Sequence, residues 1–466
     1  MTISPERVRI LDPKVGGDVD RAQFFAEHVA GRLVYVDGPG WFAWTGTHWA
    51  NDTSSDQSIA RGMVHDVSNT LLEHAKTGSA VFIDAAKVFR DSGRIDKILK
   101  EAKAPSCGLR RNVADLDADP YALNFANGTV NLRTGELRPH SPGDLITYAV
   151  GYNYRAGAHS ARWDNYLSAS QPDAGMRTFI QRLIGYGLSG STREEKLAFF
   201  YGSGRNGKGV LTETLNEIFG SPLVTTMNGD FWELTRYGRK GSLVGKLHGA
   251  RLVLSSEMTS ARLDEAFIKA YVAADTLTAD PKHKPAYDFK PTGLLVLSGN
   301  DKPTIRGTDD GIWARFLCVP WDQSFVGRED KTLKPDLLRP EHAEGIIAWA
   351  VRGAVDYFAD GLPVPQAVSS ATDEYREESN PYSEWIEQYF ESAPDGFVTN
   401  ADVKHVATRP GIRLPGTERT WRSEVVKHFG IDPADCVKPR KVAGKTQRGI
   451  PGVRLREADV FGQPHS

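Results

Sequence analysis

The sequence predicts an α/β protein in which a glycine-rich loop joins an apolar strand to a helix. From residue 197 to about residue 355, short apolar segments alternate with segments of helical periodicity, which is typical of an α/β core. The residues before this core are expected to form a mostly helical domain with a small β element. The residues after it return to short helices and strands, which are expected to form a small winged-helix-like domain.

The glycine-rich loop has the spacing G-x-x-x-x-G-K and ends at Lys208. Its glycines let backbone N–H groups approach a polyphosphate, and its lysine reaches the terminal phosphates. The apolar run 197–201 precedes it, and a helical pattern follows until Gly220. A surface glycine turn is the alternative. The predicted nucleotide-binding residues are Gly202, Ser203, Gly204, Arg205, Asn206, Gly207, Lys208, Gly209 and Val210.

One position departs from the usual pattern of such loops. Gly209 stands where a Ser or Thr hydroxyl would bind Mg²⁺. Because the backbone does most of the phosphate cradling, nucleotide binding is expected to survive this change. The sequence therefore predicts ATP and Mg²⁺ as cofactors and retained hydrolysis, while Gly209 puts the placement of the metal in question.

Two polar residues follow predicted strands behind the loop. Glu257 ends an apolar run that begins at Arg251, and it is the candidate for organising Mg²⁺ and activating water. Its alternative role is to cap a helix. Asn300 follows the strand 294–298, where its amide can orient the attacking water, contact the γ-phosphate or cap the turn.

An arginine is the fourth candidate catalytic residue, after Lys208, Glu257 and Asn300. Arg315 precedes the predicted strand 316–319, and an arginine presented to a neighbouring subunit can neutralise charge in the transition state. Arg306 on the preceding loop is a rival for this role. An ordinary surface salt bridge is the alternative for both.

Two basic segments are candidates for binding DNA. Residues 276–279 and 286–289 can pair as a hairpin that carries Lys282, His283 and Lys284 at its tip. Near the C-terminus, a run from Lys438 to Arg456 contains seven basic residues, of which Lys438, Arg440 and Lys441 are the predicted contacts. A solvated charged turn and a solvated basic tail are the alternatives.

Composition excludes several classes of protein. The formal net charge of −2 gives no global sign of nucleic-acid binding, so any basic surface must be local. Three scattered cysteines favour neither a disulfide framework nor a zinc site. With no signal peptide and no apolar run near about 18 residues, the sequence predicts a cytoplasmic protein without a membrane partner.

At 466 residues the chain is long enough for two to four domains. A hairpin is expected at 33–36 and 41–44, whose aromatic residues are assigned to a core rather than to a base-stacking surface. Further expectations are helices at 58–75, 80–101 and 163–190, a hairpin at Asn127-Gly128 and a polar linker at 374–381. The predicted domains are 1–160, 161–375 and 382–466.

The order of these motifs resembles the superfamily 3 helicases of small viruses, phages and plasmids. G-x-x-x-N-G-K is followed by L-V-L-S-S-E, I-K with A-A-D, the basic hairpin, L-V-L-S-G-N and I-W-A-R. Residues 124–137 and 184–190 are similar to the segments that precede the phosphate loop in the phage, plasmid and poxvirus-type primase–helicases. The resemblance covers about residues 40–380.

The resemblance implies a P-loop, AAA+-like helicase core that assembles as a hexameric ring on one DNA strand and translocates with ATP hydrolysis. It assigns phosphate contact to Lys208, the acidic strand-end role to Glu257, the polar sensor to Asn300 and the arginine finger to Arg315. It gives the DNA grip to Lys282 and His283, behind a helix that carries Lys269 and Asp275. Ala314 stands where many members have another arginine.

The favoured interpretation is an ATP-dependent DNA helicase, and so an ATP hydrolase, that replicates a phage, prophage or plasmid in a bacterial host. Its expected partners are single-stranded and forked DNA, further copies of itself in a homo-hexamer, and a separate primase or other replication proteins. A separate primase is expected because only about 40 residues precede the resemblance. The alternative is a nucleotide-binding replication initiator or regulatory DNA-binding protein with weak or no turnover.

Overall fold

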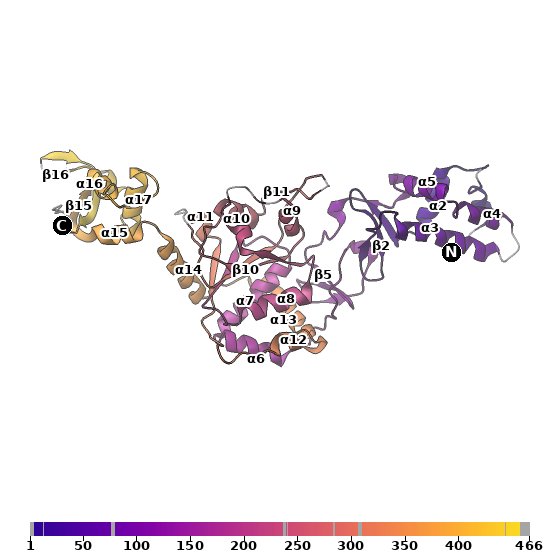
Figure 1. Cartoon of the computed structure of the whole chain (residues 1–466), viewed down its shortest axis with the longest axis horizontal. Coiled ribbons are helices and arrows are strands. Elements are labelled where there is room, and N and C mark those ends of the chain that lie inside the picture. The colour runs from indigo at the N-terminus through magenta and orange to yellow at the C-terminus, as the bar shows by residue number, and fades with distance from the viewer. Residues whose placement is uncertain are drawn as a thin grey trace.

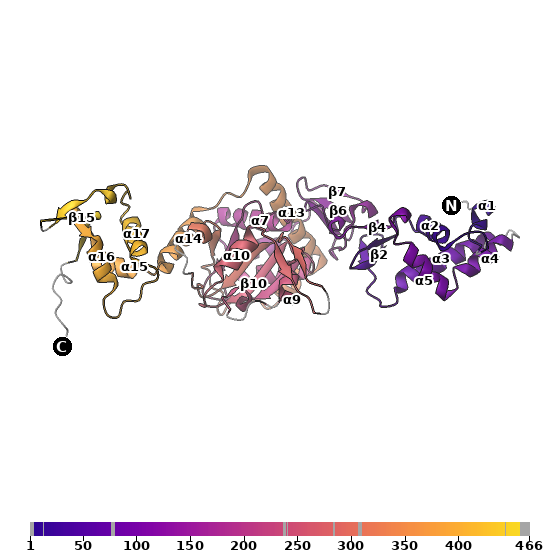
Figure 2. The same ribbon diagram turned by 90° about the horizontal axis from the view of Figure 1, so that it is seen from above.

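The computed structural model describes residues 4–12, 14–75, 80–235, 239, 241–282, 285–305, 310–442 and 444–456. The molecule is elongated, with an N-terminal part at one end, a broad central part and a C-terminal part at the other end (Figures 1 and 2). Separate buried clusters of apolar side chains lie in these three parts. The predicted domain limits stay predictions.

Among its described residues, the N-terminal part packs five α-helices beside a small sheet. In that sheet, β1 (Leu33–Val36) and β2 (Gly40–Trp44) form the predicted hairpin. Trp41 and Trp49 are only 1% exposed, which confirms their assignment to a core. The remaining elements are α1 (Pro5–Arg9), α2 (Asp18–His28), β3 (Trp49–Asn51), α3 (Ser58–Ala75), α4 (Ala80–Val88), α5 (Ser92–Glu101) and β4 (Arg110–Arg111).

Two helices predicted as single segments are divided in the structure. The segment 80–101 forms α4 and α5, because the Asp91 side chain accepts a hydrogen bond from the Arg94 N–H and starts a new helix. The segment 163–190 forms α6 (Ala161–Ser170) and α7 (Ala174–Leu188). Pro172 lies between them, and Asp173 caps α7 by accepting from the Met176 N–H.

A five-stranded parallel sheet forms the centre of the molecule, in the order β14-β8-β13-β10-β9. Parallel strands are buried on both faces, and alternate residues of β8 illustrate this. Ala198 and Phe200 pack with α7 and α13, whereas Leu197 and Phe199 pack with α10. The strands are β8 (Leu197–Tyr201), β9 (Val224–Asn228), β10 (Leu252–Met258), β13 (Leu294–Gly299) and β14 (Phe316–Pro320).

Helices surround this sheet, and two small sheets adjoin it. The predicted hairpin at Asn127-Gly128 joins β5 (Ala122–Phe125) to β6 (Gly128–Asn131), and β7 (Leu137–Arg138) extends that sheet. The predicted pairing of 276–279 with 286–289 is present as β11 (Leu277–Ala279) and β12 (Tyr287–Phe289). The helices are α8 (Lys208–Phe219), α9 (Gly241–Val244), α10 (Glu265–Val272), α11 (Asp310–Trp313), α12 (Leu333–Leu337), α13 (Pro340–Asp360) and α14 (Gln366–Ser379).

The predicted linker at 374–381 is largely helical instead, because α14 continues to Ser379. The exposed side chains of this segment are polar, which is why a linker was expected. Tyr375, however, is only 2% exposed and packs on the central part. The C-terminal part then begins with α15 (Ser383–Tyr389). It continues through β15 (Phe390–Thr399), α16 (Asn400–Ala407), α17 (Glu418–His428), β16 (Arg440–Val442), β17 (Lys445–Gln447) and β18 (Gly449–Leu455).

Two further features bear on the sequence predictions. Cys107, Cys318 and Cys436 are free thiols. Within the described ranges, every helix is too short or too polar to cross a lipid bilayer.

Helices α7 and α13 pack closely against each other in the central part. A Cβ atom at Gly185 would overlap the backbone of Gly353 and Ala354, so a side chain there must push the two helices apart. Gly62, inside α3, has open space where its Cβ would lie.

These two glycines give opposite expectations for stability. Gly185→Ala should destabilise the central part by about 1–3 kcal/mol, the usual cost of overpacking. Gly62→Ala should leave stability unchanged or raise it by about 0.5–1 kcal/mol, because alanine favours a helix. Urea unfolding followed by circular dichroism measures both, and equal stability of the Gly185→Ala variant and the parent would contradict the expectation.

Candidate functional site

The glycine-rich loop lies between β8 and α8, as predicted. The glycine before Lys208, Gly207, cannot be replaced by a residue with a side chain without strain. Gly207 has φ +96°, which is strained for a residue with a side chain. A Cβ atom there would also lie 2.5 Å from the Ser170 Oγ of α6. The loop therefore has to carry glycine immediately before Lys208, where α8 begins.

Contacts from distant parts of the chain hold the loop in place. The Tyr166 hydroxyl of α6 donates to the Gly207 carbonyl at 2.9 Å. Asn206 is buried, and its Nδ2 donates to the Trp321 carbonyl, just after β14, at 2.9 Å. The Phe325 N–H donates to the Arg205 carbonyl at 2.9 Å. The loop is thus fixed before any ligand binds.

Lys208 is the functional centre of this arrangement. Lys208 is only 7% exposed. Its Nζ donates hydrogen bonds to the Gly202 carbonyl at 2.7 Å and to Asn300 Oδ1 at 3.4 Å. Burial lowers the pKa of Lys208 to about 8. No ion pair joins this ammonium to a carboxylate among the described residues. A desolvated cation without a carboxylate attracts an anion, and the first N–H groups of α8 support the same preference.

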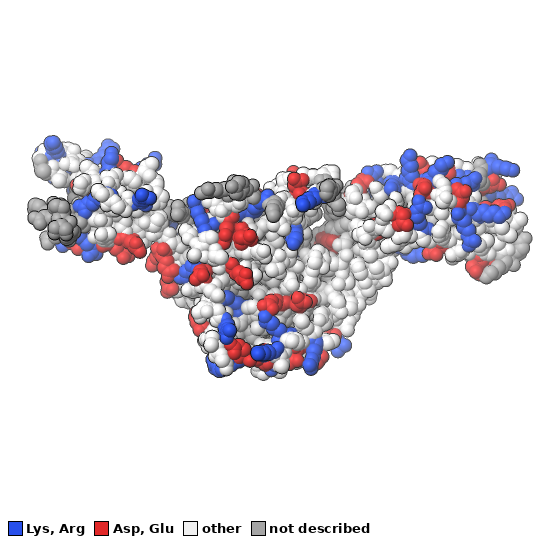
Figure 3. Space-filling model, viewed as in Figure 1, with Lys and Arg blue, Asp and Glu red and all other residues white. Residues whose placement is uncertain are grey.

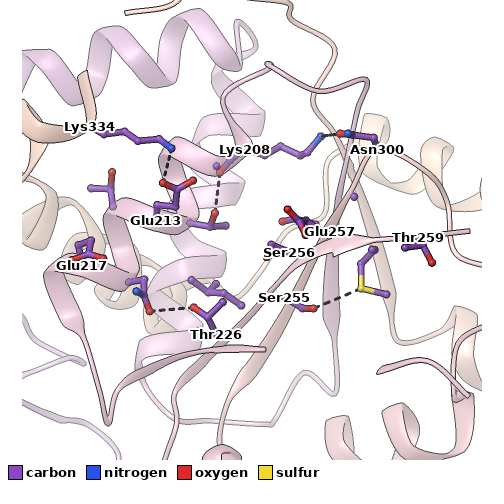
Figure 4. A pocket seen from close by; sticks show the side chains of 18 of the residues that line it. Lys208, Glu213, Glu217, Thr226, Ser255, Ser256, Glu257, Thr259, Asn300 and Lys334 are labelled. Carbon is purple, nitrogen blue, oxygen red and sulfur yellow. Dashed lines mark hydrogen bonds and ion pairs between the residues drawn. The ribbon is translucent and has the colours of Figure 1, made fainter. Parts of the chain in front are cut away.

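Two adjoining cavities meet at Lys208. One, of about 910 Å³, borders α8 and the carboxyl ends of β10 and β13, and Lys208, Glu257 and Asn300 all line it (Figure 4). The other, of about 650 Å³, extends from the loop to α6 and to residues 325–334. Lys208, Gly209, Asn300 and Lys334 line both. The two cavities therefore adjoin each other at these four residues.

The larger cavity has an oxygen-rich wall. Glu257 adopts φ +60°, an uncommon conformation for a residue other than glycine, and its side chain lies at the cavity below Lys208 (Figure 4). Ser298 also lines the cavity, and its buried Oγ has no hydrogen-bond partner among the described residues. Within the same residues, no three His, Cys, Asp or Glu side chains lie close enough together to hold a metal ion. A magnesium ion here would therefore need oxygens from a bound phosphate, which is its usual manner of binding.

Arg315 lies away from these cavities. Parallel pairing of β8 with β14 aligns Leu197 with Phe316, so Arg315 sits at the starting edge of the sheet, whereas the loop leaves its carboxyl edge. Five residues of strand separate the two edges by about 16 Å. The Arg315 guanidinium pairs with Glu195 at 2.8 Å.

The predicted DNA contacts are exposed where they are described. Lys282 lies at the tip of the β11–β12 hairpin, and its neighbours His283 and Lys284 lie outside the described residues, as does Arg306. Lys438, Arg440 and Lys441 are exposed, the last two on β16. Lys438 approaches Asp435 at 3.9 Å.

Sequence reasoning missed several residues of the site. Tyr166 and Ser170 brace the loop from behind, but their contacts with it span 37 or more positions and leave no local signal. Glu213 and Lys334 line the larger cavity and pair with each other at 2.5 Å. The spacing of Glu213 four residues after Gly209, on one helical face, is a signal that could have indicated it.

Family models and relatives among known proteins match parts of this chain. Residues 22–172 match a family model described as D5 N terminal like, and residues 200–315 match a family of unknown function. A protein of Acanthamoeba polyphaga mimivirus, provisionally named a helicase, is 28% identical over 338 residues, which cover 65% of this chain and 35% of that protein.

These matches support a phage and poxvirus-type helicase family for this chain. A provisionally named helicase of Frog virus 3 (isolate Goorha) is 26% identical to this chain, over 56% of the chain and 29% of the viral protein. One of Invertebrate iridescent virus 3 is 22% identical, over 46% of the chain and 24% of the viral protein. The chain thus spans only about a third or less of the length of these relatives.

A solved structure of the C-terminal region of NrS-1 without ligand is also similar to this chain. The likeness has a TM-score of 0.43 at 14% identity, and covers 68% of this chain and 87% of that structure.

The lowered pKa of Lys208 predicts that anion binding depends on pH. The empty protein begins to lose the Lys208 proton near pH 8, and a bound phosphate would raise the pKa again, so binding takes up a proton above this pH. The affinity for ATP, which is a convenient probe, should fall by up to about tenfold per pH unit above pH 8. Titrations between about pH 7.5 and 9.5, with circular dichroism to verify folding, measure this.

Lys208→Ala is the matched control for that titration, because it removes the titrating group. Its weaker binding should vary little with pH over the same range. An ATP affinity of the parent protein that stays constant to about pH 9.5 would contradict the contact of Lys208 with the bound phosphates.

Proposed function

We propose that this protein is an ATP-dependent DNA helicase of superfamily 3 that acts in the replication of a phage, prophage or plasmid. The desolvated ammonium of Lys208, set in a glycine loop beside Asn300 and Glu257 at the carboxyl edge of a parallel sheet, is the observation that carries the proposal. Ligands bind at this edge in open α/β sheets. The proposed core is a P-loop, AAA+-like ATPase.

The proposal gives each residue of the site a task. The backbone of residues 202–210 and the Lys208 ammonium hold the phosphates, while the smaller cavity accepts the nucleoside. Glu257 orients or deprotonates the attacking water, and Asn300 positions the γ-phosphate. A magnesium ion, when bound among the phosphates, would neutralise charge that develops during hydrolysis. The orphan Ser298 hydroxyl and the Glu257 carboxylate fit such an oxygen-rich site.

Arg315 supports assembly of several copies. It lies at the opposite edge of the sheet from the loop of its own subunit, so it can reach a nucleotide only in a neighbouring subunit. In that role Arg315 would release its ion pair with Glu195 and contact the phosphates bound to the neighbouring subunit. A closed ring of six subunits around one DNA strand is the proposed assembly.

Two surfaces are proposed to contact DNA. The β11–β12 hairpin presents Lys282, and in the C-terminal part the β16–β17 hairpin presents Arg440 and Lys441. Helices α15, α16 and α17 with β15, β18 and this hairpin follow the order of a winged helix, in which the hairpin is the wing. Acidic residues gather instead where α14 meets the C-terminal part (Figure 3), so DNA is expected at the wing.

A second candidate function is a nucleotide-binding initiator or regulator without turnover. Gly209 favours it, because the loop lacks the hydroxyl that usually binds the metal. A separate primase is the proposed partner in either case.

Fork unwinding tests the helicase proposal. With Mg²⁺ and ATP, the parent protein should separate a forked duplex and hydrolyse ATP, and Lys208→Ala should lose both activities by at least about a hundredfold. Mass photometry of the same samples should detect the assembly. Nucleotide binding without hydrolysis or unwinding would favour the initiator, and a protein that stays monomeric with DNA and Mg-ATP would overturn the ring.

The wing has its own test. Replacing Arg440 and Lys441 with alanine should weaken single-stranded DNA binding and reduce the salt dependence of log K by about one to two units, since two phosphate contacts are removed. Lys97→Ala with Lys100→Ala removes the same charge from the exposed side of α5 and serves as the control. Equal losses in the two double variants would contradict a specific role for the wing.

A further inference from the structure

Gly209 leaves an open position at the first turn of α8. The residue is exposed and lines both cavities, so a side chain at this position would face the proposed phosphate site. A hydroxyl at this point of a nucleotide loop ordinarily binds the magnesium ion. The protein therefore needs another oxygen here if it is to hold that metal.

Glu213 lies beside the position that this hydroxyl would take. It lies one turn further along α8, and a Cβ atom built at Gly209 would be 3.0 Å from Glu213 Oε1. The carboxylate thus folds back along the helix towards the missing side chain, at the border of the larger cavity (Figure 4). Because residue 209 is glycine, it has no side chain that would displace the Glu213 carboxylate.

The remaining contacts of Glu213 leave it available for a cation. Its Oε2 accepts a hydrogen bond from Lys334 Nζ at 2.5 Å, and the two side chains are 60% and 48% exposed. A surface pair of this kind is weak and readily exchanged. The nearby hydroxyl of Thr212 is a poorer candidate, because its Oγ1 donates to the Lys208 carbonyl at 3.3 Å within the helix.

We propose that Glu213 supplies the protein oxygen that holds the divalent cation of the bound nucleotide, in place of the hydroxyl absent at Gly209. This inference rests on the proposed nucleotide site. Magnesium is usually bound by one or two carboxylates together with phosphate oxygens and water, and Glu213 with a nucleotide provides that donor set. Lys334 balances the carboxylate when no cation is bound.

The test compares nucleotide affinity with magnesium and with a chelator. A fluorescent ATP analogue should bind the parent protein more tightly in magnesium than in EDTA. Glu213→Gln should reduce this magnesium effect by about tenfold or more, with little change in the affinity measured in EDTA. Adding Gly209→Ser to Glu213→Gln should restore much of the effect, because it returns the hydroxyl.

Two control variants separate metal binding from other roles of Glu213. Glu217→Gln alters a carboxylate one turn further along the same helix and the same cavity, and should keep the full magnesium effect. Lys334→Ala breaks the ion pair and should also keep it. A magnesium effect unchanged in Glu213→Gln, or lost equally in Lys334→Ala, would overturn this inference while leaving the nucleotide site intact. Absence of nucleotide binding by the parent would overturn the proposed function as well.

Discussion

The functional site depends on the buried ammonium of Lys208. Among the described residues, this ammonium has only neutral oxygens as hydrogen-bond partners. Lys208 donates to a backbone carbonyl and to the Asn300 amide, and burial alone lowers its pKa. Burying a charge without an opposite charge beside it costs folding stability. The parallel sheet, the glycine loop and the start of α8 together keep this cation in place, and an arriving phosphate removes its unfavourable desolvation.

The loop is rigid because the contacts that hold it come from separate parts of the fold. Tyr166 reaches it from α6, and the Trp321 carbonyl reaches it from the chain after β14. Arg205 adds an ion pair with Glu329 at 2.7 Å. A preformed site binds its ligand without the entropy cost of ordering a loop. The division of α6 from α7 at Pro172 matters here, because α6 can turn its Tyr166 towards the loop.

Sequence reasoning identified the elements whose signal is local. The strand 197–201, the end of α8 at Gly220 and the β11–β12 hairpin follow from runs of apolar residues and from turn residues. It failed where only one face of a helix is buried. Val368 and Tyr375 are the buried residues of α14, whose other positions are mostly polar, and its end was predicted to be a linker. The bracing of the loop by Tyr166 was invisible because it depends on tertiary contact. The roles of Glu257, Asn300 and Arg315 stay predictions.

The edge of the central sheet formed by β14 has a consequence for assembly. Helix α14 packs along β14, and the Thr372 Oγ1 of α14 accepts a hydrogen bond from the Cys318 N–H of that strand at 3.0 Å. Main-chain groups of β14 are thus covered rather than presented to solvent. Copies of this chain cannot extend their sheets into one another along this border. Any oligomer that uses this side must join through side chains, and it can come apart or shift without breaking a β-ladder.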